Sequence, residues 1–153
     1  MKIALASDHA GFPLKQHLVG YLKQHGHEVI DLGVATDSVP SDYPDAAEAL
    51  GKAVLDGRAE RGILLCGSGV GACVAANKQT GIYAAICHDT YSAHQGVEHD
   101  NMNVLCIGAR VVGQNVAEEL ALAFIHATFS GAERHVRRFN KTLAIEQRNA
   151  SQS

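Results

Sequence analysis

The sequence has no long basic run, and its 13 Lys and Arg are outnumbered by 16 Asp and Glu, for a formal net charge of -3 with His neutral. A nucleic-acid-binding domain needs a concentrated positive surface. No apolar run approaches the roughly 20 residues of a membrane-spanning helix. The chain starts with Met1 and Lys2 and enters a short apolar run directly, unlike a signal peptide. We therefore expect neither a nucleic-acid partner nor a membrane partner.

The sequence also lacks any Cys-x-x-Cys pair, the spacing that many zinc sites use. Its four cysteines are separated by 7, 14 and 19 residues: Cys66, Cys73, Cys87 and Cys106. Three histidines match no metal-ligand spacing either: His88, His94 and His99. A chain of 153 residues can bury a core without disulfides. We expect no metal site, a core position for Cys87 and Cys106, and a reduced, cytoplasmic protein.

Short apolar runs alternate with helical patterns throughout, and no repeat or linker divides the chain, so one domain over residues 1–153 is expected. Strands are predicted at residues 3–6, 28–32, 63–66, 82–87 and 104–108. Helices are predicted at residues 13–26, 44–57, 72–78, 116–129 and about 133–147. The strands lack polar alternation, which is typical of strands covered on both faces. The pattern predicts a doubly wound, Rossmann-like α/β domain with a five-stranded parallel sheet.

Polar clusters follow several of the predicted strands. Residues 8–9 follow the first strand, 66–71 follow the third, 88–89 follow the fourth, and Arg110 lies just past the fifth. In such sheets ligands bind beyond the carboxyl ends of the strands, so these clusters predict a ligand site there. Residues 99–101 precede the fifth strand, and we expect a loop to fold them over the site.

The segment 66–71 (CGSGVG) carries glycines at alternate positions. Glycines let the backbone approach a ligand closely, and a following helix offers free N–H groups to an anion and favours a thiolate at Cys66. The spacing is not the dinucleotide GxGxxG, although Asp89 lies roughly where a ribose-binding acid would. No Lys-Ser/Thr follows the glycines, which excludes a loop that binds nucleotide triphosphates. A cysteine phosphatase needs the pattern Cys-x5-Arg, and Ala72 stands at the position of that Arg. The functional interpretation that remains for this segment is a loop that binds a small oxyanion, with the Cys66 thiol at its edge. The structural alternative is a tight strand-to-helix turn with a buried cysteine.

Two further groups have an ordinary and a functional interpretation. The Asp8 and His9 side chains are expected to be exposed at the carboxyl edge of the sheet, where ligands bind. They would either cap the following helix or contact a ligand. Arg134 and Arg138 stand four residues apart, on one face of the last predicted helix, and Arg137 points elsewhere. Two guanidinium groups on one face form either a solvated basic surface or a phosphate clamp.

Five motifs occur in order along about residues 1–147: SDHAGF (7–12), SDYP (41–44), CGSGVG (66–71), AANK (75–78) and NVL to Arg110 (103–110). In this combination the chain resembles the type B ribose-5-phosphate isomerase family, whose relatives act on allose 6-phosphate and galactose 6-phosphate. The resemblance implies interconversion of a phosphorylated aldose and ketose without a cofactor. It also implies a homodimer or homotetramer with shared active sites, and we expect the last helix to pack at a subunit interface.

The resemblance further implies roles for matching residues. Cys66 would be the base that moves a proton between C1 and C2, and His99 the acid that opens the sugar ring. The backbone after Cys66, with one hydroxyl, would hold the enediolate: Gly67, Ser68, Gly69, Val70 and Gly71. Two side chains would meet sugar hydroxyls or the ring oxygen: Asp8 and Tyr43. The phosphate would be held by His9, Arg134 and Arg138, with Arg110 alongside.

The physical chemistry of the residues agrees with these roles. Proton abstraction beside a carbonyl creates an oxyanion, which preorganised N–H donors stabilise well. Isomerisation needs a base that can take and return a proton near neutral pH. Contacts to a remote phosphate can align the reacting carbons.

Four positions distinguish this chain within the family. One branch lacks the cysteine and has Glu after the last glycine; Ala72 and Cys66 place this chain in the cysteine branch. Asp100 stands where the family usually has Asn, and Tyr83 replaces a common arginine.

Ribose 5-phosphate and ribulose 5-phosphate are the expected substrate pair. The alternatives are the same chemistry on another four- to six-carbon phosphosugar (allose 6-phosphate, galactose 6-phosphate or erythrose 4-phosphate), and a non-catalytic phosphosugar-binding module.

Overall fold

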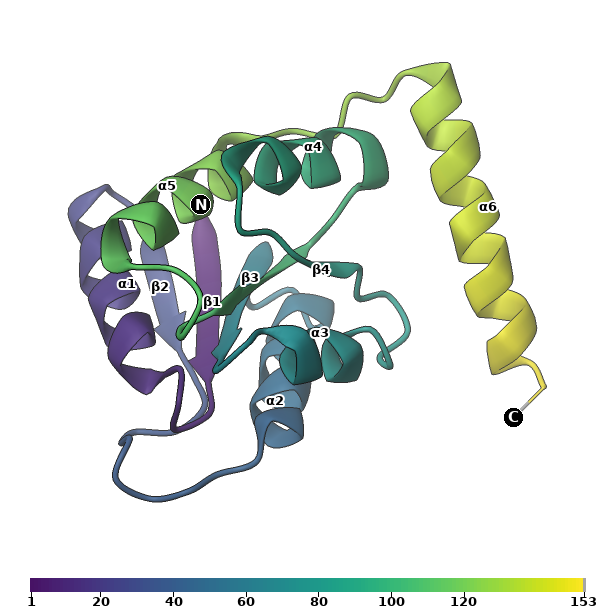
Figure 1. Ribbon diagram of the computed structural model, residues 1–153. Coiled ribbons are helices and arrows are strands. Elements are labelled where there is room, and N and C mark those ends of the chain that lie inside the picture. The colour runs from purple at the N-terminus through teal and green to yellow at the C-terminus, as the bar shows by residue number, and fades with distance from the viewer. Residues whose placement is uncertain (153) are drawn as a thin grey trace.

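The computed structural model describes residues 1–152 and contains one five-stranded sheet with the strand order β2-β1-β3-β5-β4 (Figure 1). Every paired strand is parallel to its neighbour. The strands are β1 (Lys2–Ser7), β2 (Glu28–Asp31), β3 (Arg61–Cys66), β4 (Ala84–Ile86) and β5 (Val104–Gly108). The predicted doubly wound α/β sheet is confirmed, and β4 is shorter than the run at 82–87 suggested.

The described residues form six helices: α1 (Phe12–Gln24), α2 (Tyr43–Leu55), α3 (Val70–Ala76), α4 (Thr90–Asp100), α5 (Gln114–His126) and α6 (Glu133–Ala150). Helices α1, α4 and α5 cover one face of the sheet, and α2 and α3 cover the other (Figure 1). Residues alternate between the two faces along each strand. In β1, Ile3 and Leu5 pack under α1 and α5, while Ala4 and Ala6 pack under α2.

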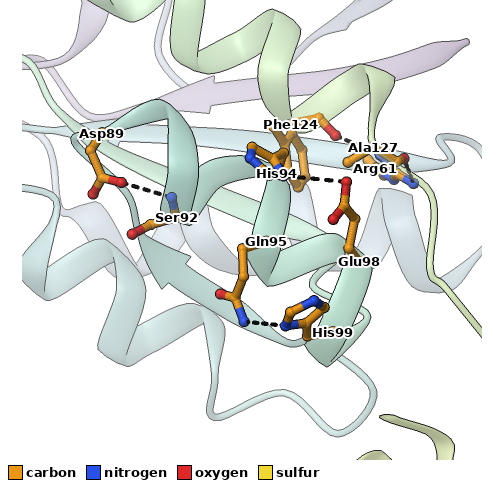
Figure 2. A network of polar contacts seen from close by, with 9 residues as sticks. All are labelled: Arg61, Asp89, Ser92, His94, Gln95, Glu98, His99, Phe124 and Ala127. Atoms are coloured by element: carbon orange, nitrogen blue, oxygen red, sulfur yellow. Dashed lines mark hydrogen bonds and ion pairs between the residues drawn. The ribbon is translucent and has the colours of Figure 1, made fainter. Parts of the chain in front are cut away.

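Helix α4 was not predicted, and the expectation of a loop at residues 99–101 is wrong for His99 and Asp100. The helix buries only small or short side chains, Ala93, Gly96 and Val97, so its apolar pattern is weak. Its ends are nevertheless well marked. Asp89 Oδ1 accepts a hydrogen bond from Ser92 N at 2.7 Å (Figure 2), and Asn101 ends the helix with φ 54°. Aspartate is a preferred N-cap, and asparagine tolerates the left-handed conformation.

The other helix boundaries differ from the predictions by at most three residues. Helix α3 ends at Ala76 and not Lys78. Helix α5 spans 114–126, where 116–129 was expected, and α6 continues to Ala150 beyond the expected 147. Such differences are ordinary, because helix ends fray and their apolar pattern fades.

Helix α6 stands apart from the sheet (Figure 1) and is fixed mainly through the turn at 81–83 and the end of α4. Tyr83 donates its hydroxyl to Glu146 Oε2 at 3.3 Å and meets the Phe139 ring edge-on at 5.1 Å. Val136 and Ile145 remain exposed on α6. Tyr83, the residue that replaces an arginine, therefore helps to dock α6, and the predicted subunit interface on this helix stays a prediction.

None of the helices in the described part of the chain has the length and apolarity that crossing a bilayer requires.

Candidate active site

A pocket of about 340 Å³ opens where β1, β3 and β5 end side by side. Eight predicted site residues line it: Asp8, His9, Tyr43, Cys66, Gly67, Ser68, Gly71 and Arg110. Ala10 and Val111 complete the lining and were not predicted. Gly69 and Val70 belong to the same loop without lining the pocket. The carboxyl edge of the sheet thus brings most of the predicted residues together.

Cys66 is the last residue of β3 and is only 5% exposed. Gly69 N donates a hydrogen bond to Cys66 Sγ at 3.1 Å. This is possible because Gly69 adopts φ 83°, and a Cβ there would also come within 3.2 Å of the backbone of Ile107 and Gly108. Cys66 therefore lies buried in a tight turn that also directs a backbone N–H at its sulfur, and both interpretations of this segment stay open.

Ser68 is exposed next to the thiol. Its Oγ accepts a hydrogen bond from Val70 N at 3.2 Å. Because the hydroxyl oxygen is the acceptor, its own proton remains available to a ligand oxygen.

Asp8 is buried, 7% exposed, so the prediction of an exposed side chain is wrong for this residue. Its Oδ1 accepts a hydrogen bond from Gly11 N at 3.0 Å, which ties the carboxylate to the turn before α1. Asp8 still lines the pocket. Asp8 therefore stabilises the turn before α1 without capping the helix, whose N-cap is Gly11 with no side-chain cap bond. Its contact with a ligand stays a prediction.

His9 is held by Ser41, whose role was not predicted. His9 N donates to Ser41 Oγ at 2.9 Å, and Ser41 N donates to His9 Nδ1 at 3.0 Å. A backbone N–H can only donate, so Nδ1 is the acceptor and the neutral ring carries its proton on Nε2. His9 can thus offer an Nε2–H donor to a bound anion.

Lys15 supports this arrangement and was also missed. Its side chain is 2% exposed, with Nζ 2.8 Å from Asp31 Oδ1 and 2.8 Å from the carbonyl oxygens of Leu32 and Val34. These contacts anchor the segment that leads from β2 to Ser41. Lys15 shares a helix face with Val19, four residues on, and this position on an apolar face was the available signal.

The absence of a side chain at Gly71 and Gly67 lets the side chains of Tyr43 and Arg110 pack directly on the backbone of the loop. A Cβ on Gly71 would lie 2.7 Å from Tyr43 Cζ, so the tyrosine ring packs directly on that backbone. A Cβ on Gly67 would lie 3.1 Å from an Arg110 guanidinium nitrogen, and Arg110 N donates to Gly67 O at 2.9 Å. Arg110 thereby places a positive charge beside the loop.

Four predicted site residues belong neither to this pocket nor to the loop after Cys66: His99, Asp100, Arg134 and Arg138. Gly62 N, at the start of β3, donates to Asn103 O, just after α4. Cys66 lies four residues further along β3, about 13 Å at roughly 3.3 Å per residue. The two groups therefore lie toward opposite ends of the sheet within one chain.

The four distant residues form a second group where α4 meets α6. The rings of His99 and His135 stack at 4.0 Å between centroids. Burial, followed by the charges of His99, Arg134 and Arg138, lowers the pKa of His135, so all these groups lie near one another. Asp100 lines a separate cavity of about 280 Å³ together with Tyr83 and Phe139. The residues predicted as the acid and the phosphate clamp thus lie near one another but away from the thiol, and their roles stay predictions.

The remaining cysteines behave as core groups with one exception. Cys87 and Cys106 are 3% and 0% exposed, which confirms their predicted core positions. Burial raises the pKa of Cys87 to about 11. A hydrogen bond from Cys106 lowers the pKa of the half-buried Cys73 to about 7, against the effect of its burial. Across residues 1–152, His, Cys, Asp and Glu side chains form no group of three that could hold a metal.

A doubly wound sheet with a thiol, an N–H-rich loop and a buried carboxylate at its carboxyl edge defines an α/β enzyme that can stabilise an oxyanion. The model of the Ribose/Galactose Isomerase family matches residues 3–142, and the chain belongs to this family.

Relatives agree over nearly the whole chain. The ribose-5-phosphate isomerase B of Escherichia coli K12 is 44% identical over 147 residues, 96% of this chain and 97% of its own. A D-erythrulose-4-phosphate isomerase of Pectobacterium atrosepticum is 44% identical over 131 residues, 86% of each chain. The solved Clostridium thermocellum ribose-5-phosphate isomerase B superposes with a TM-score of 0.93 at 41% identity, covering 97% of this chain and 99% of that one. The chain is therefore a sugar phosphate isomerase by family.

Proposed function

We propose that this protein interconverts ribose 5-phosphate and ribulose 5-phosphate, with Cys66 as the base. The observation that carries the proposal is the hydrogen bond from Gly69 N to Cys66 Sγ, in a pocket that also holds Asp8 and Tyr43. The Escherichia coli relative, 44% identical, bears the name of this activity. A thiolate next to N–H donors suits proton transfer beside a carbonyl.

The proposed reaction begins with the open-chain aldose. The Cys66 thiolate takes the proton from C2, and the electrons of that bond form the C1–C2 double bond of an enediolate. Backbone N–H groups of residues 67–71 and the Ser68 hydroxyl stabilise the negative oxygen. The thiol then returns the proton to C1, while the hydroxyl proton at O2 moves to O1. The product has the same composition and the same number of electrons as the substrate, so the reaction requires no cofactor.

Asp8 and Tyr43 line the same pocket and are proposed to bind sugar hydroxyls or the ring oxygen. His9 offers an Nε2–H donor, and Arg110 a positive charge. Both suit the phosphate, an anion with several acceptor oxygens. Four free thiols are typical of a reducing compartment, and we therefore propose a cytoplasmic location.

We propose that the site is completed by a second copy of the chain. His99, Arg134 and Arg138 lie away from Cys66 in one chain, although the mechanism needs an acid and a phosphate clamp beside it. Exposed Val136 and Ile145 on α6 give a second copy apolar surface to cover. A two-fold dimer would pair each Cys66 with the distant group of the other copy, and a homotetramer would contain two such dimers.

Mixed subunits test this arrangement. Cys66→Ala and His99→Asn chains are each expected to be inactive alone. After unfolding and refolding together, half of the dimers combine both variants, and each of these holds one intact site, so activity should return to about a quarter of wild type. Co-refolded variants that stay as inactive as either alone would show that both groups act within one chain.

A four-carbon phosphosugar is the second candidate substrate, favoured by Asp100. A carboxylate beside an enediolate raises the energy of the anion, so an exposed Asp100 is better used to accept a hydrogen bond from a sugar hydroxyl. The 44% identical relative from Pectobacterium atrosepticum is named for erythrulose 4-phosphate. We expect Asp100→Asn to shift kcat/KM toward ribose 5-phosphate in a panel of four- to six-carbon phosphosugars. An unchanged ranking would remove Asp100 from specificity.

A further inference from the structure

His99 sits in a defined polar setting at the end of α4 that the proposed reaction has not used. Gln95, one helical turn earlier, places its Nε2 atom 3.0 Å from His99 Nδ1, as Figure 2 shows. The same Nε2 atom lies 3.5 Å from Asp100 Oδ2. One amide nitrogen therefore faces both the imidazole and the carboxylate.

Asp100 determines which end of the Gln95 amide faces the imidazole. An ionised carboxylate only accepts hydrogen bonds, so the NH₂ end of the amide is favoured beside it, and the carbonyl end is repelled. The NH₂ group has two hydrogens, one for Asp100 and one for His99 Nδ1. With asparagine at position 100, either end of the amide could find a partner, and the choice would not be fixed.

The amide orientation in turn determines the tautomer of His99. A nitrogen that accepts a hydrogen bond carries no proton, so the neutral ring has its proton on Nε2. Within residues 1–152, His99 Nε2 makes no hydrogen bond, and it is free to donate.

The ring is also held in its plane by α6. His135 stacks on His99 with an interplanar angle of 25°. His135 is itself fixed, because its Nδ1 lies 2.5 Å from Ser130 Oγ and the side chain is 4% exposed. The imidazole of His99 is therefore constrained on one face by His135 and at Nδ1 by Gln95, which leaves Nε2 as the atom that can donate a proton.

We propose that Gln95 is a positioning residue that, oriented by Asp100, holds His99 as the Nε2–H tautomer and so prepares it to protonate the ring oxygen of a cyclic phosphosugar. The inference rests on the proposed function, in which His99 opens the ring. It gives Asp100 a role inside its own chain that is separate from any contact with substrate. A reversed tautomer would present a bare nitrogen to the ring oxygen, and in enzymes such a reversal costs orders of magnitude in kcat.

The test is the tautomer itself, measured by ¹⁵N NMR of the full-length protein at about pH 9, where imidazoles are neutral. His99→Gln assigns the His99 signals among the nine histidines. Wild type should show the proton on Nε2. Gln95→Glu keeps the shape but offers only acceptors, and it should move the proton to Nδ1. Gln95→Leu and Asp100→Asn should each give a mixture of tautomers. A mixture still contains the Nε2–H form, so the loss of turnover in Asp100→Asn should be small beside its expected shift of substrate preference toward ribose 5-phosphate.

A matched control lies on the same helix. His94 Nδ1 is 3.3 Å from Glu98 Oε1, another pair four residues apart (Figure 2). Glu98→Gln alters that pair and should leave the tautomer of His99 unchanged. If Gln95→Glu still shows the Nε2 proton, or if Glu98→Gln changes the tautomer equally, the inference is overturned.

Kinetics separate this inference from the proposed function. Gln95→Glu should lower turnover of ribose 5-phosphate by on the order of a hundredfold or more, as expected for a mis-protonated acid. Turnover of erythrose 4-phosphate, which cannot close a ring, should change little. A reversed tautomer with unchanged ribose 5-phosphate turnover would refute His99 as the ring-opening acid, and the structural inference about Gln95 would stand on the NMR result.

Discussion

Replacing Lys15 by methionine tests how the substrate pocket is supported. Methionine keeps the length and apolar stem of the side chain but removes the ammonium group. Three acceptors at 2.8 Å lose their partner: Asp31 Oδ1 and the carbonyl oxygens of Leu32 and Val34. The Asp31 side chain is 38% exposed and can turn to water, so most of the cost falls on the two carbonyl groups.

The magnitude follows from these contacts. An unsatisfied buried acceptor costs about 1–3 kcal/mol, and the ammonium was itself costly to bury. We expect Lys15→Met to lower the free energy of unfolding by about 3 kcal/mol and Tm by roughly 6–12 °C for a chain of this size. The loosened segment carries Ser41, which holds His9, so KM for a phosphosugar should rise more than kcat falls.

Urea unfolding followed by circular dichroism measures the first effect, and steady-state kinetics the second. Lys23→Met, on the exposed side of the same helix, is the control and should stay within about 0.5 kcal/mol of wild type. Lys15→Met with wild-type stability and wild-type KM would refute the argument that this buried cation supports the pocket.

Three further predictions concern other groups. Removing the charge of Arg134 or Arg138 should raise KM strongly for a phosphosugar and little for the unphosphorylated sugar; equal effects on both would exclude a phosphate clamp. Cys73, with its pKa lowered to about 7 mainly by a hydrogen bond from Cys106, should react with iodoacetamide with a rate midpoint near pH 7, and this phase should vanish in Cys73→Ser. Burial lowers the pKa of His135 below the ordinary 6.5, so the unfolded chain binds this proton first as pH falls. Stability should therefore decrease below about pH 6.5, and His135→Phe should reduce that decrease in urea unfolding at several pH values.

The sequence was sufficient for the sheet and for the Cys66 side of the site. Buried parallel strands are continuous apolar runs, and alternating glycines after a strand have few uses other than close backbone approach. Asp8, Cys66 and Arg110 each lie at or just past the end of a predicted strand, so the carboxyl-edge rule is enough to bring them together.

The rest depends on contacts that a linear pattern does not encode. Helix α4 buries too small an apolar face for its period to stand out, so His99 was wrongly assigned to a loop. The position of Lys15 on the apolar face of α1 indicates burial, but its three acceptors follow from the fold and not from that pattern. The contacts of Gln95 with His99 and Asp100 could not be predicted either, because helix α4 brings these residues together and was itself not predicted. A site divided between copies of the chain would be visible only in an assembly.

Deuterium uptake from solvent tests the central proposal most directly. In D₂O, wild-type protein and ribose 5-phosphate should give ribulose 5-phosphate, with deuterium at C2 of the recovered aldose. Cys66→Ala should lose this exchange by at least about a hundredfold, the contribution of a positioned base, while still binding ribose 5-phosphate in calorimetry. Exchange at the wild-type rate in Cys66→Ala would contradict the account, because the proton would then be moved by another group.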